Sequence, residues 1–173
     1  MIQSARFNRA NRWIQEKDHI RTNGPETFAG ETYTSMLFMR PLRDQFKVSA
    51  KVSFDEEMAP AIVVAQQPTY LSGDCWEYRE HFEVVLFNQG INLWHHVYVD
   101  HTPSWTKLGH WRLAVQSRKK YNLRVTCTEK DITVELDELH LGSKELTLRL
   151  PVFAGITGCE GLNRFYEFKL HSI

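Results

Sequence analysis

The chain has 173 residues, of which 42% are apolar and 24% are charged, as in ordinary soluble globular domains. A chain of this length can bury roughly 70% of its unfolded surface, so it needs no disulfide or metal to fold. We expect one domain over residues 1–173. The 21 basic and 21 acidic residues cancel, which argues against a nucleic-acid partner and against a polybasic membrane contact.

The chain shows no targeting or membrane signal. Its first residues, MIQSARFNRANRWIQEKDH, contain no apolar stretch of signal-peptide length, and no run approaches the roughly 18 apolar residues of a membrane span. The three cysteines, Cys75, Cys127 and Cys159, lack metal-site or redox-motif spacing and predict reduced thiols. We therefore expect a cytoplasmic protein with no cofactor.

Period-2 alternation of apolar and polar residues recurs along the chain, and a weak helical pattern is confined to the first dozen residues. The expected strands, in chain order, are a segment around Trp13 and residues 36–39, 46–54, 61–65, 81–88, 91–98, 121–128, 132–137, 148–156 and 165–170. Many short strands with little helix predict an all-β fold, a two-sheet antiparallel β-sandwich of the jelly-roll type, with less than about a tenth of the residues in α-helix.

The most informative segment is the hairpin HFEVVLFNQGINLWHHVY at residues 81–98. We expect a two-residue turn at Gln89–Gly90, because glycine can adopt the positive φ of a tight turn. Glu83 then lies directly opposite His96, within reach of a carboxylate–imidazole hydrogen bond. One face of the hairpin, with Phe82, Val84 and Leu86, points into the core. The other face carries His81, Glu83, Val85, Phe87, Asn92, Trp94, His96 and Tyr98.

This second face predicts a saccharide site. Aromatic rings stack on the C–H faces of a sugar, with Trp94 as the stacking residue, and carboxylate and amide groups hydrogen-bond its hydroxyls. Four of the five tryptophans and five of the eight histidines lie between residues 70 and 111, which favours a groove or an interface. The alternative is a solvated face with an incidental Glu83–His96 ion pair.

Neighbouring segments supply further candidates. Trp76 and Trp105 lie in polar, loop-like stretches that predict exposed or rim positions, whereas the alternation after Trp111 favours a core position. The segment WEYRE at residues 76–80 forms either one wall of the groove or a charged loop. Glu160 and Arg164, in the glycine-rich segment GITGCEGLNRF, either reach the groove or pair with each other.

Two kinds of site are not expected. The adjacent histidines His95 and His96 point to opposite sides of a strand and cannot chelate one ion together, so we expect no metal site. The chain also lacks a Gly-x-Ser-x-Gly nucleophile elbow and an activated cysteine motif.

The segments FKVSAKVSFD, APAIVVAQQ, HFEVVLFNQGINLWHHVY, YNLRVTCTEKDITVELDE and FAGITGCEGLNRFYEFKL resemble the concanavalin A-like lectin/glucanase superfamily, most closely its laminin-G-like and 3-keto-disaccharide hydrolase-type members. The resemblance runs from about Phe46 to the C-terminus and implies a jelly roll with carbohydrate recognition on its concave sheet. The Glu-x-Asp-x-x-Glu motif of the retaining glucanases is absent, and the calcium and manganese ligands of the lectins have no counterparts here.

These observations leave three hypotheses. The favoured one is a carbohydrate-binding protein with a small saccharide ligand. The second is a glycoside hydrolase or lyase acting in the same groove, and the third is an assembly protein, such as a homodimer, that uses the aromatic face as an interface. The candidate catalytic residues are Glu83, His96 and Glu160. The candidate saccharide-binding residues are His81, Asn92, Trp94, Tyr98, Trp76 and Arg164.

Overall fold

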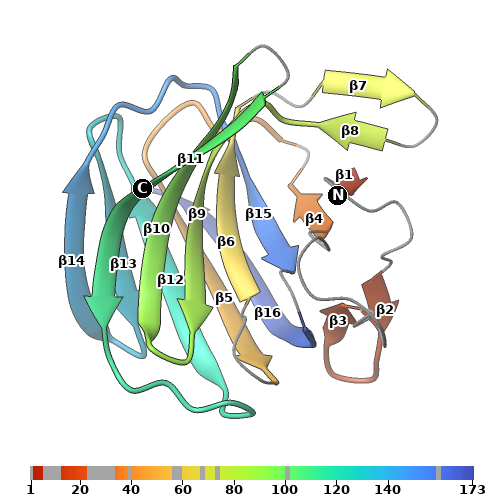
Figure 1. Cartoon of the computed structure of the whole chain (residues 1–173), viewed down its shortest axis with the longest axis vertical. Helices are drawn as coiled ribbons and strands as arrows, with labels where there is room; N and C mark the ends of the chain where they lie inside the picture. Colours follow the sequence, from red (N-terminus) through yellow and green to blue (C-terminus); the bar gives the residue numbers. More distant parts are fainter. Residues whose placement is uncertain are drawn as a thin grey trace.

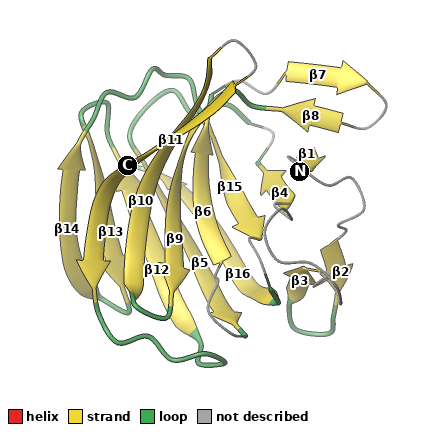
Figure 2. Ribbon diagram, in the orientation of Figure 1, coloured by secondary structure: helices red, strands yellow, loops and turns green. Residues whose placement is uncertain are grey.

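The computed structural model describes residues 2–5, 13–22, 34–38, 40–55, 60–66, 69–72, 75–99, 102–158 and 161–173. The described residues form strands and loops and no helix (Figure 2), so none of them belongs to a membrane-spanning helix. The strands are β1 Ile2–Ala5, β2 Trp13–Gln15, β3 Ile20–Thr22, β4 Thr34–Leu37, β5 Phe46–Phe54, β6 Pro60–Ala65, β7 Thr69–Ser72, β8 Cys75–Glu77, β9 Glu80–Phe87, β10 Gly90–Val99, β11 Thr102–Arg112, β12 Tyr121–Cys127, β13 Asp131–Leu136, β14 Leu139–Glu145, β15 Phe153–Gly158 and β16 Asn163–Ser172. This confirms the predicted all-β fold.

Two antiparallel sheets of seven described strands each pack face to face, with a separate small hairpin formed by β7 and β8 (Figure 1). The first sheet has the order β1-β4-β15-β6-β9-β10-β11, and the second has the order β14-β13-β12-β5-β16-β3-β2. Neighbours such as β15 and β6 are far apart in sequence, as expected for a jelly roll. The two-sheet sandwich predicted from the alternation is therefore correct.

Alternation along the strands builds the core between the two sheets. In β5 every second residue, from Phe46 to Phe54, is buried, and β12 and β13 follow the same rule. All six residues of β6 are buried, because this central strand is covered on both faces. Cys127 is free and lies in this core, and burial raises the pKa of its thiol. The side chains of Cys75 and Cys159 lie outside the described residues.

The errors in the strand prediction fall mostly on edge strands. The strands β11 and β14 were not predicted, and Trp105 lies in β11, not in a loop. Both strands lie at the edge of a sheet and are largely exposed, so neither shows the alternation that a half-buried strand requires. Trp76 likewise belongs to β8, and among the described strands β8 pairs with β7 alone.

Two further corrections concern the ends of the chain. The helical pattern of the first dozen residues was wrong for Ile2–Ala5, which pair with β4, because strand pairing in the tertiary structure overrides a weak local preference. Residues 6–12 lie outside the described part. The strand expected at residues 148–156 begins only at Phe153 and extends to Gly158.

Candidate functional site

The β9–β10 hairpin carries most of the selected residues, and its turn lies one residue earlier than predicted. Phe87 pairs with Gly90, so the turn is Asn88–Gln89. A Cβ atom on Gly90 would lie 2.0 Å from the carbonyl oxygen of Trp111 on β11, so this position needs glycine for the close strand contact as well as for its φ of 133°. The partner of each residue therefore changes by two positions, and because the side-chain period of a strand is also two, each face keeps its predicted side chains.

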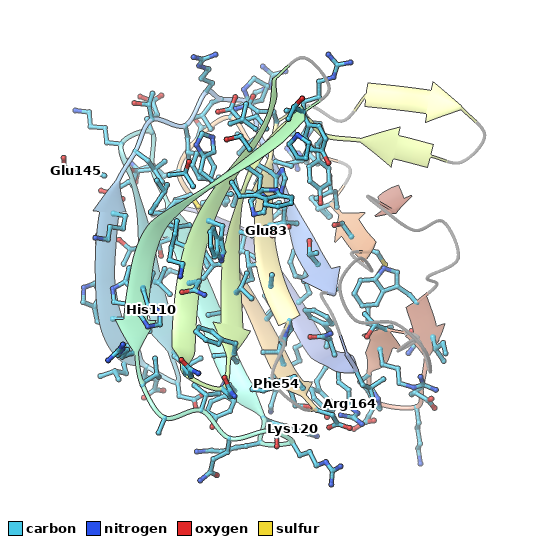
Figure 3. The ribbon with its side chains drawn as sticks, viewed as in Figure 1. Phe54, Glu83, His110, Lys120, Glu145 and Arg164 are labelled. Atoms are coloured by element: carbon cyan, nitrogen blue, oxygen red, sulfur yellow. The ribbon has the colours of Figure 1, made fainter. Side chains whose placement is uncertain are left out.

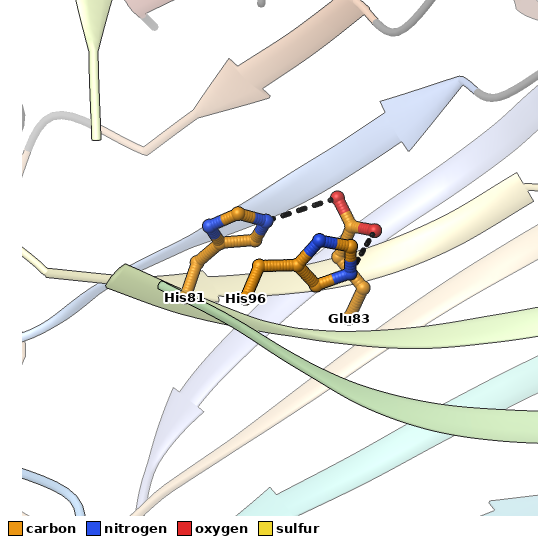
Figure 4. Close-up of side chains that lie close together, drawn as sticks. All are labelled: His81, Glu83 and His96. Atoms are coloured by element: carbon orange, nitrogen blue, oxygen red, sulfur yellow. Dashed lines mark ion pairs between the residues drawn. The ribbon is translucent and has the colours of Figure 1, made fainter. Parts of the chain in front are cut away.

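The shift changes which side chains stand opposite each other. Glu83 pairs with Trp94 and His96 pairs with His81, so the predicted direct opposition of Glu83 and His96 was wrong. The two are diagonal neighbours, and they still form the expected contact: Glu83 Oε2 lies 3.2 Å from His96 Nε2. A second imidazole joins them, with His81 Nε2 3.5 Å from Glu83 Oε1 (Figure 4).

These three residues, the His–Glu–His cluster, are removed from solvent. The exposed fractions of His81, Glu83 and His96 are 0%, 2% and 8%. The two imidazole rings stack with their centroids 4.5 Å apart and their planes 21° apart. Because a carboxylate loses its hydration when it is buried, it needs hydrogen-bonding or charged partners, and both imidazoles are within reach of Glu83. The cluster is therefore not part of a solvated face.

On one side of the cluster the outer face of the first sheet is covered. Four buried residues from β4, β6 and the segment before β9 form a small second core, here called the covered part: Leu37, Val63, Ala65 and Tyr78. The Tyr78 ring meets His81 edge to face at 4.7 Å, and its hydroxyl lies 2.5 Å from Ser35 Oγ. Ser35 is in turn hydrogen-bonded to Thr157 on β15 at 2.9 Å. This packing excludes a ligand from the covered part.

On the other side of the cluster the face is open to solvent. Four residues of β10 and β11 form what we call the open part: Trp94, Trp105, Lys107 and His110. The Trp105 side chain is 55% exposed, and its ring centroid lies 6.1 Å from that of His96. Lys107 Nζ lies 4.8 Å from the centre of the Trp94 ring, a cation–π contact. An exposed indole thus stands at the edge of the buried cluster.

Polar contacts order the remainder of this surface. His110 Nδ1 lies 2.8 Å from the side-chain oxygen of Asn92, across the β10–β11 pair. Figure 3 shows His110 toward the lower end of β11 and Glu83 near the middle of the sheet. The open part supplies an aromatic platform and a cation, and the adjacent Asn92 adds an amide; all of these groups can contact a polyhydroxylated ligand.

The structure brings together five of the selected residues, His81, Glu83, Asn92, Trp94 and His96, on one face of the hairpin. Tyr98 follows on that face and is half-buried. His95 points to the opposite side, as expected: its Nε2 lies 3.0 Å from Glu80, and its ring stacks on Phe82.

Arg164 lies elsewhere. It belongs to β16 in the second sheet, and its guanidinium donates two hydrogen bonds to the carboxylate of Asp55, at 2.9 and 3.2 Å. These bonds, with a further contribution from Arg118, lower the pKa of Asp55. Glu160 and the side chains of Trp76 and Glu77 lie outside the described residues.

Sequence reasoning missed three residues that shape the outer face of the first sheet: two in the open part and one in the covered part. Lys107 and His110 lie on an edge strand without alternation, and Tyr78 was treated as part of a segment that was either a wall or a loop. A usable signal was present for one of them. Trp105 and Lys107 are two residues apart, so they share a face if the segment is a strand.

The chain was compared with known proteins. No family model and no curated protein matches it. Solved structures do match: a carbohydrate binding module, CBM66, from Bacillus subtilis has a TM-score of 0.70 at 10% identity, over 99% of this chain and 96% of that one. A legume lectin-like domain from Entamoeba histolytica has a TM-score of 0.62 at 12% identity, over 99% and 90% of the two chains.

The fold is that of the concanavalin A-like jelly rolls. A third similar structure is the exoplasmic/lumenal domain of VIP36 in a form with Ca²⁺ and Man3GlcNAc bound, with a TM-score of 0.59 at 12% identity, over 99% of this chain and 84% of that one. Identities this low establish the shared fold and leave the function to be argued from this chain's own residues. The resemblance stated from the sequence is thereby confirmed for the fold.

Proposed function

We propose that this protein binds carbohydrate on the open part of the first sheet, with Trp105 as the principal stacking residue and Trp94 beside it. The observation that carries the proposal is the exposed Trp105 ring, which sits on a sheet face beside Trp94, Lys107 and the buried cluster. A monomer gains little by exposing a large ring, whereas stacking on a sugar would cover it. Several proteins with this fold are carbohydrate-binding modules or lectin-like domains by name.

The position of Glu83 changes the role that the sequence suggested for it. With 2% of its surface exposed and both carboxylate oxygens facing imidazoles, Glu83 holds His81 and His96 in place beneath the ligand surface. The groups that can reach sugar hydroxyls are the exposed ones, Lys107 and His110, together with the partly exposed Asn92.

Binding is favoured over hydrolysis because hydrolysis needs a second carboxylate. Glycosidases place two carboxyl groups about 5–5.5 Å or 6.5–9.5 Å apart. Among the described outer-face side chains of β4, β15, β6, β9, β10 and β11, Glu83 is the only carboxylate. Glu160, the partner suggested by the sequence, is not among the described residues.

The test is a titration of a small glycan panel against the full chain, with tryptophan fluorescence as the readout. Trp105→Ala should weaken binding by about tenfold to a hundredfold, because a stacked ring at a binding hot spot contributes a few kcal/mol. Trp94→Ala should weaken binding less, since that ring is already covered by Lys107. Leu139→Ala is the matched control, because Leu139 is 59% exposed but lies on β14 in the other sheet.

Three results would contradict the proposal. One is a glycan that binds the wild type and Trp105→Ala equally well. Another is a loss of affinity in Leu139→Ala as large as that in Trp105→Ala. The third is a panel without any binder, combined with a stable dimer that Trp105→Ala dissociates, which would make the open part a subunit interface. Release of new reducing ends or unsaturated products would instead favour an enzyme.

A further inference from the structure

The His–Glu–His cluster has the composition and spacing of a metal site. One ligand atom from each of His81, Glu83 and His96 lies within 4.8 Å of the others, and no second such cluster occurs among the described residues. The strand geometry produces this convergence: His81 and Glu83 are two residues apart on β9, and His96 is directly paired with His81 on β10. We infer that His81, Glu83 and His96 bind a divalent transition-metal ion of the Zn²⁺ class.

The three side chains are close enough to converge on one ion. Four-coordinate Zn²⁺ holds nitrogen and oxygen ligands at about 2.0–2.1 Å, so two ligand atoms of one tetrahedron stand about 3.3 Å apart. His81 Nε2 lies 3.5 Å from Glu83 Oε1 and His96 Nε2 lies 3.2 Å from Glu83 Oε2, so each imidazole faces a different oxygen of the same carboxylate, and one donor atom from each residue lies within 4.8 Å of the others. Binding of one ion requires the two Nε2 atoms to approach a shared point in front of the carboxylate, between the two oxygens that they face (Figure 4).

The ligand atoms select the kind of ion. Two imidazole nitrogens and one carboxylate oxygen form a set that suits Zn²⁺, Co²⁺ and related ions, whereas Ca²⁺ needs six to eight oxygen ligands. Three protein ligands leave a fourth position on Zn²⁺ for water or for a ligand oxygen.

Burial and access are compatible with an ion. A divalent cation would compensate the buried charge of Glu83 more fully than hydrogen bonds from imidazoles do. His96 is the most exposed member of the cluster and adjoins the exposed Trp105, so the ion would enter from the open part. This inference stands on the cluster alone and does not require that the protein binds a sugar.

The experiment uses the untagged full chain after treatment with a chelator. Titration with Zn²⁺ should show one ion per chain, and Co²⁺ should give the visible absorption of a four-coordinate nitrogen–oxygen site. At a free Zn²⁺ concentration a hundred times Kd, the melting temperature should rise by about 5–10 °C. Ca²⁺ at the same concentration should leave it unchanged.

Variants assign the site to its residues. Glu83→Gln and His96→Ala should each weaken Zn²⁺ binding by more than the roughly 10–100-fold that loss of a supporting residue costs. His140→Ala is the matched control, because this exposed histidine lies on β14 in the other sheet and is not part of the cluster. Its affinity should stay within about twofold of the wild type. Circular dichroism of each metal-free variant establishes that it is folded; if His96→Ala is not, Glu83→Gln carries the comparison.

The inference is overturned if the wild type shows neither a thermal shift nor the Co²⁺ spectrum, if His140→Ala loses as much affinity as Glu83→Gln, or if Ca²⁺ stabilises as strongly as Zn²⁺. Running the glycan panel on metal-free and Zn²⁺-loaded protein separates the two proposals. Zn²⁺ binding without any glycan binding contradicts only the proposed function, and glycan binding without Zn²⁺ binding contradicts only the metal site.

Discussion

The covered part and the open part are two regions of the same sheet face, and they differ in what lies above them. In the covered part Tyr78 seals Leu37, Val63 and Ala65 from water. In the open part, a few strands away, the Trp105 ring is 55% exposed. The strands below both regions follow the same pleated geometry, so the fold of the sheet does not decide which region can meet a ligand. The segment before β9 decides it, by placing Tyr78 over one side of the His–Glu–His cluster.

The largest change in unfolding free energy is expected at Tyr78, and it tests whether the covered part is a packed layer. Tyr78→Ala removes a ring that is 2% exposed, and such a change to a buried aromatic residue costs about 3–5 kcal/mol of unfolding free energy. Tyr78→Phe keeps the ring and loses only the hydrogen bond to Ser35, at a cost of about 1 kcal/mol. Urea unfolding measures both. If Tyr78→Ala cost less than Tyr78→Phe, the covered part would not be a packed layer.

Val84 lies on the inner face of the same strand, so its substitution gives the stability cost of an ordinary core residue for comparison. It is 1% exposed in the core between the sheets, so Val84→Ala should cost about 1–3 kcal/mol, from lost burial and the cavity left behind. The same unfolding measurement applies. A cost near zero would mean that the two faces of β9 are assigned the wrong way round.

The Asp55–Arg164 ion pair lies outside both the covered and the open part, and its contribution to the unfolding free energy should depend on pH. The pKa of Asp55 is lowered in the folded protein, so the pair contributes stability above the unfolded-state pKa of about 3.9, and this contribution is lost as the pH falls through the lower folded-state value. At pH 7 Asp55→Asn should cost about 1.5–2 kcal/mol, the lower end of the range for hydrogen bonds to charged groups, because both side chains are partly exposed.

Chemical unfolding of the wild type and Asp55→Asn at pH 7 and pH 3 measures this difference. The gap in unfolding free energy should narrow at the lower pH. A gap that stays constant or widens would show that the carboxylate charge does not hold Arg164.

The smallest expected effect on stability is at Trp105, in the open part. Because the ring is mostly exposed, Trp105→Ala should change the unfolding free energy by no more than about 0.5 kcal/mol. A much smaller change in unfolding free energy for Trp105→Ala than for Tyr78→Ala would distinguish an aromatic residue that faces a ligand from one that packs the fold. A loss of 2 kcal/mol or more would place Trp105 in the packing of the fold.

The sequence predicted the faces of the hairpin better than its register. Alternation assigns Val84 to the core and Glu83 to the outer face whether the turn is at Asn88–Gln89 or at Gln89–Gly90, because the two registers differ by two residues, which is the side-chain period of a strand. The register itself depends on the contact of Gly90 with β11, an element that the sequence pattern did not show.

Burial of the outer face could not be predicted from the pattern either. A glutamate on the polar side of a strand is ordinarily solvated, and only the tertiary structure shows that Glu83 is buried between two imidazoles, one of which packs against Tyr78. No metal site was expected from the sequence because the adjacent His95 and His96 point to opposite sides of the strand, and the structure shows that they do. The convergence of His81 with His96 across two strands required the observed pairing.

The most direct test of ligand binding on the open part is a two-dimensional NMR titration that follows the indole N–H signals of ¹⁵N-labelled protein with a glycan that binds. We expect the signals of Trp105 and Trp94 to shift with ligand concentration. The signals of Trp13, which packs on Phe165 in the second sheet, and of Trp111, which packs against the core, should stay in place. Shifts confined to Trp13 or Trp111, with Trp105 and Trp94 unmoved, would contradict the account.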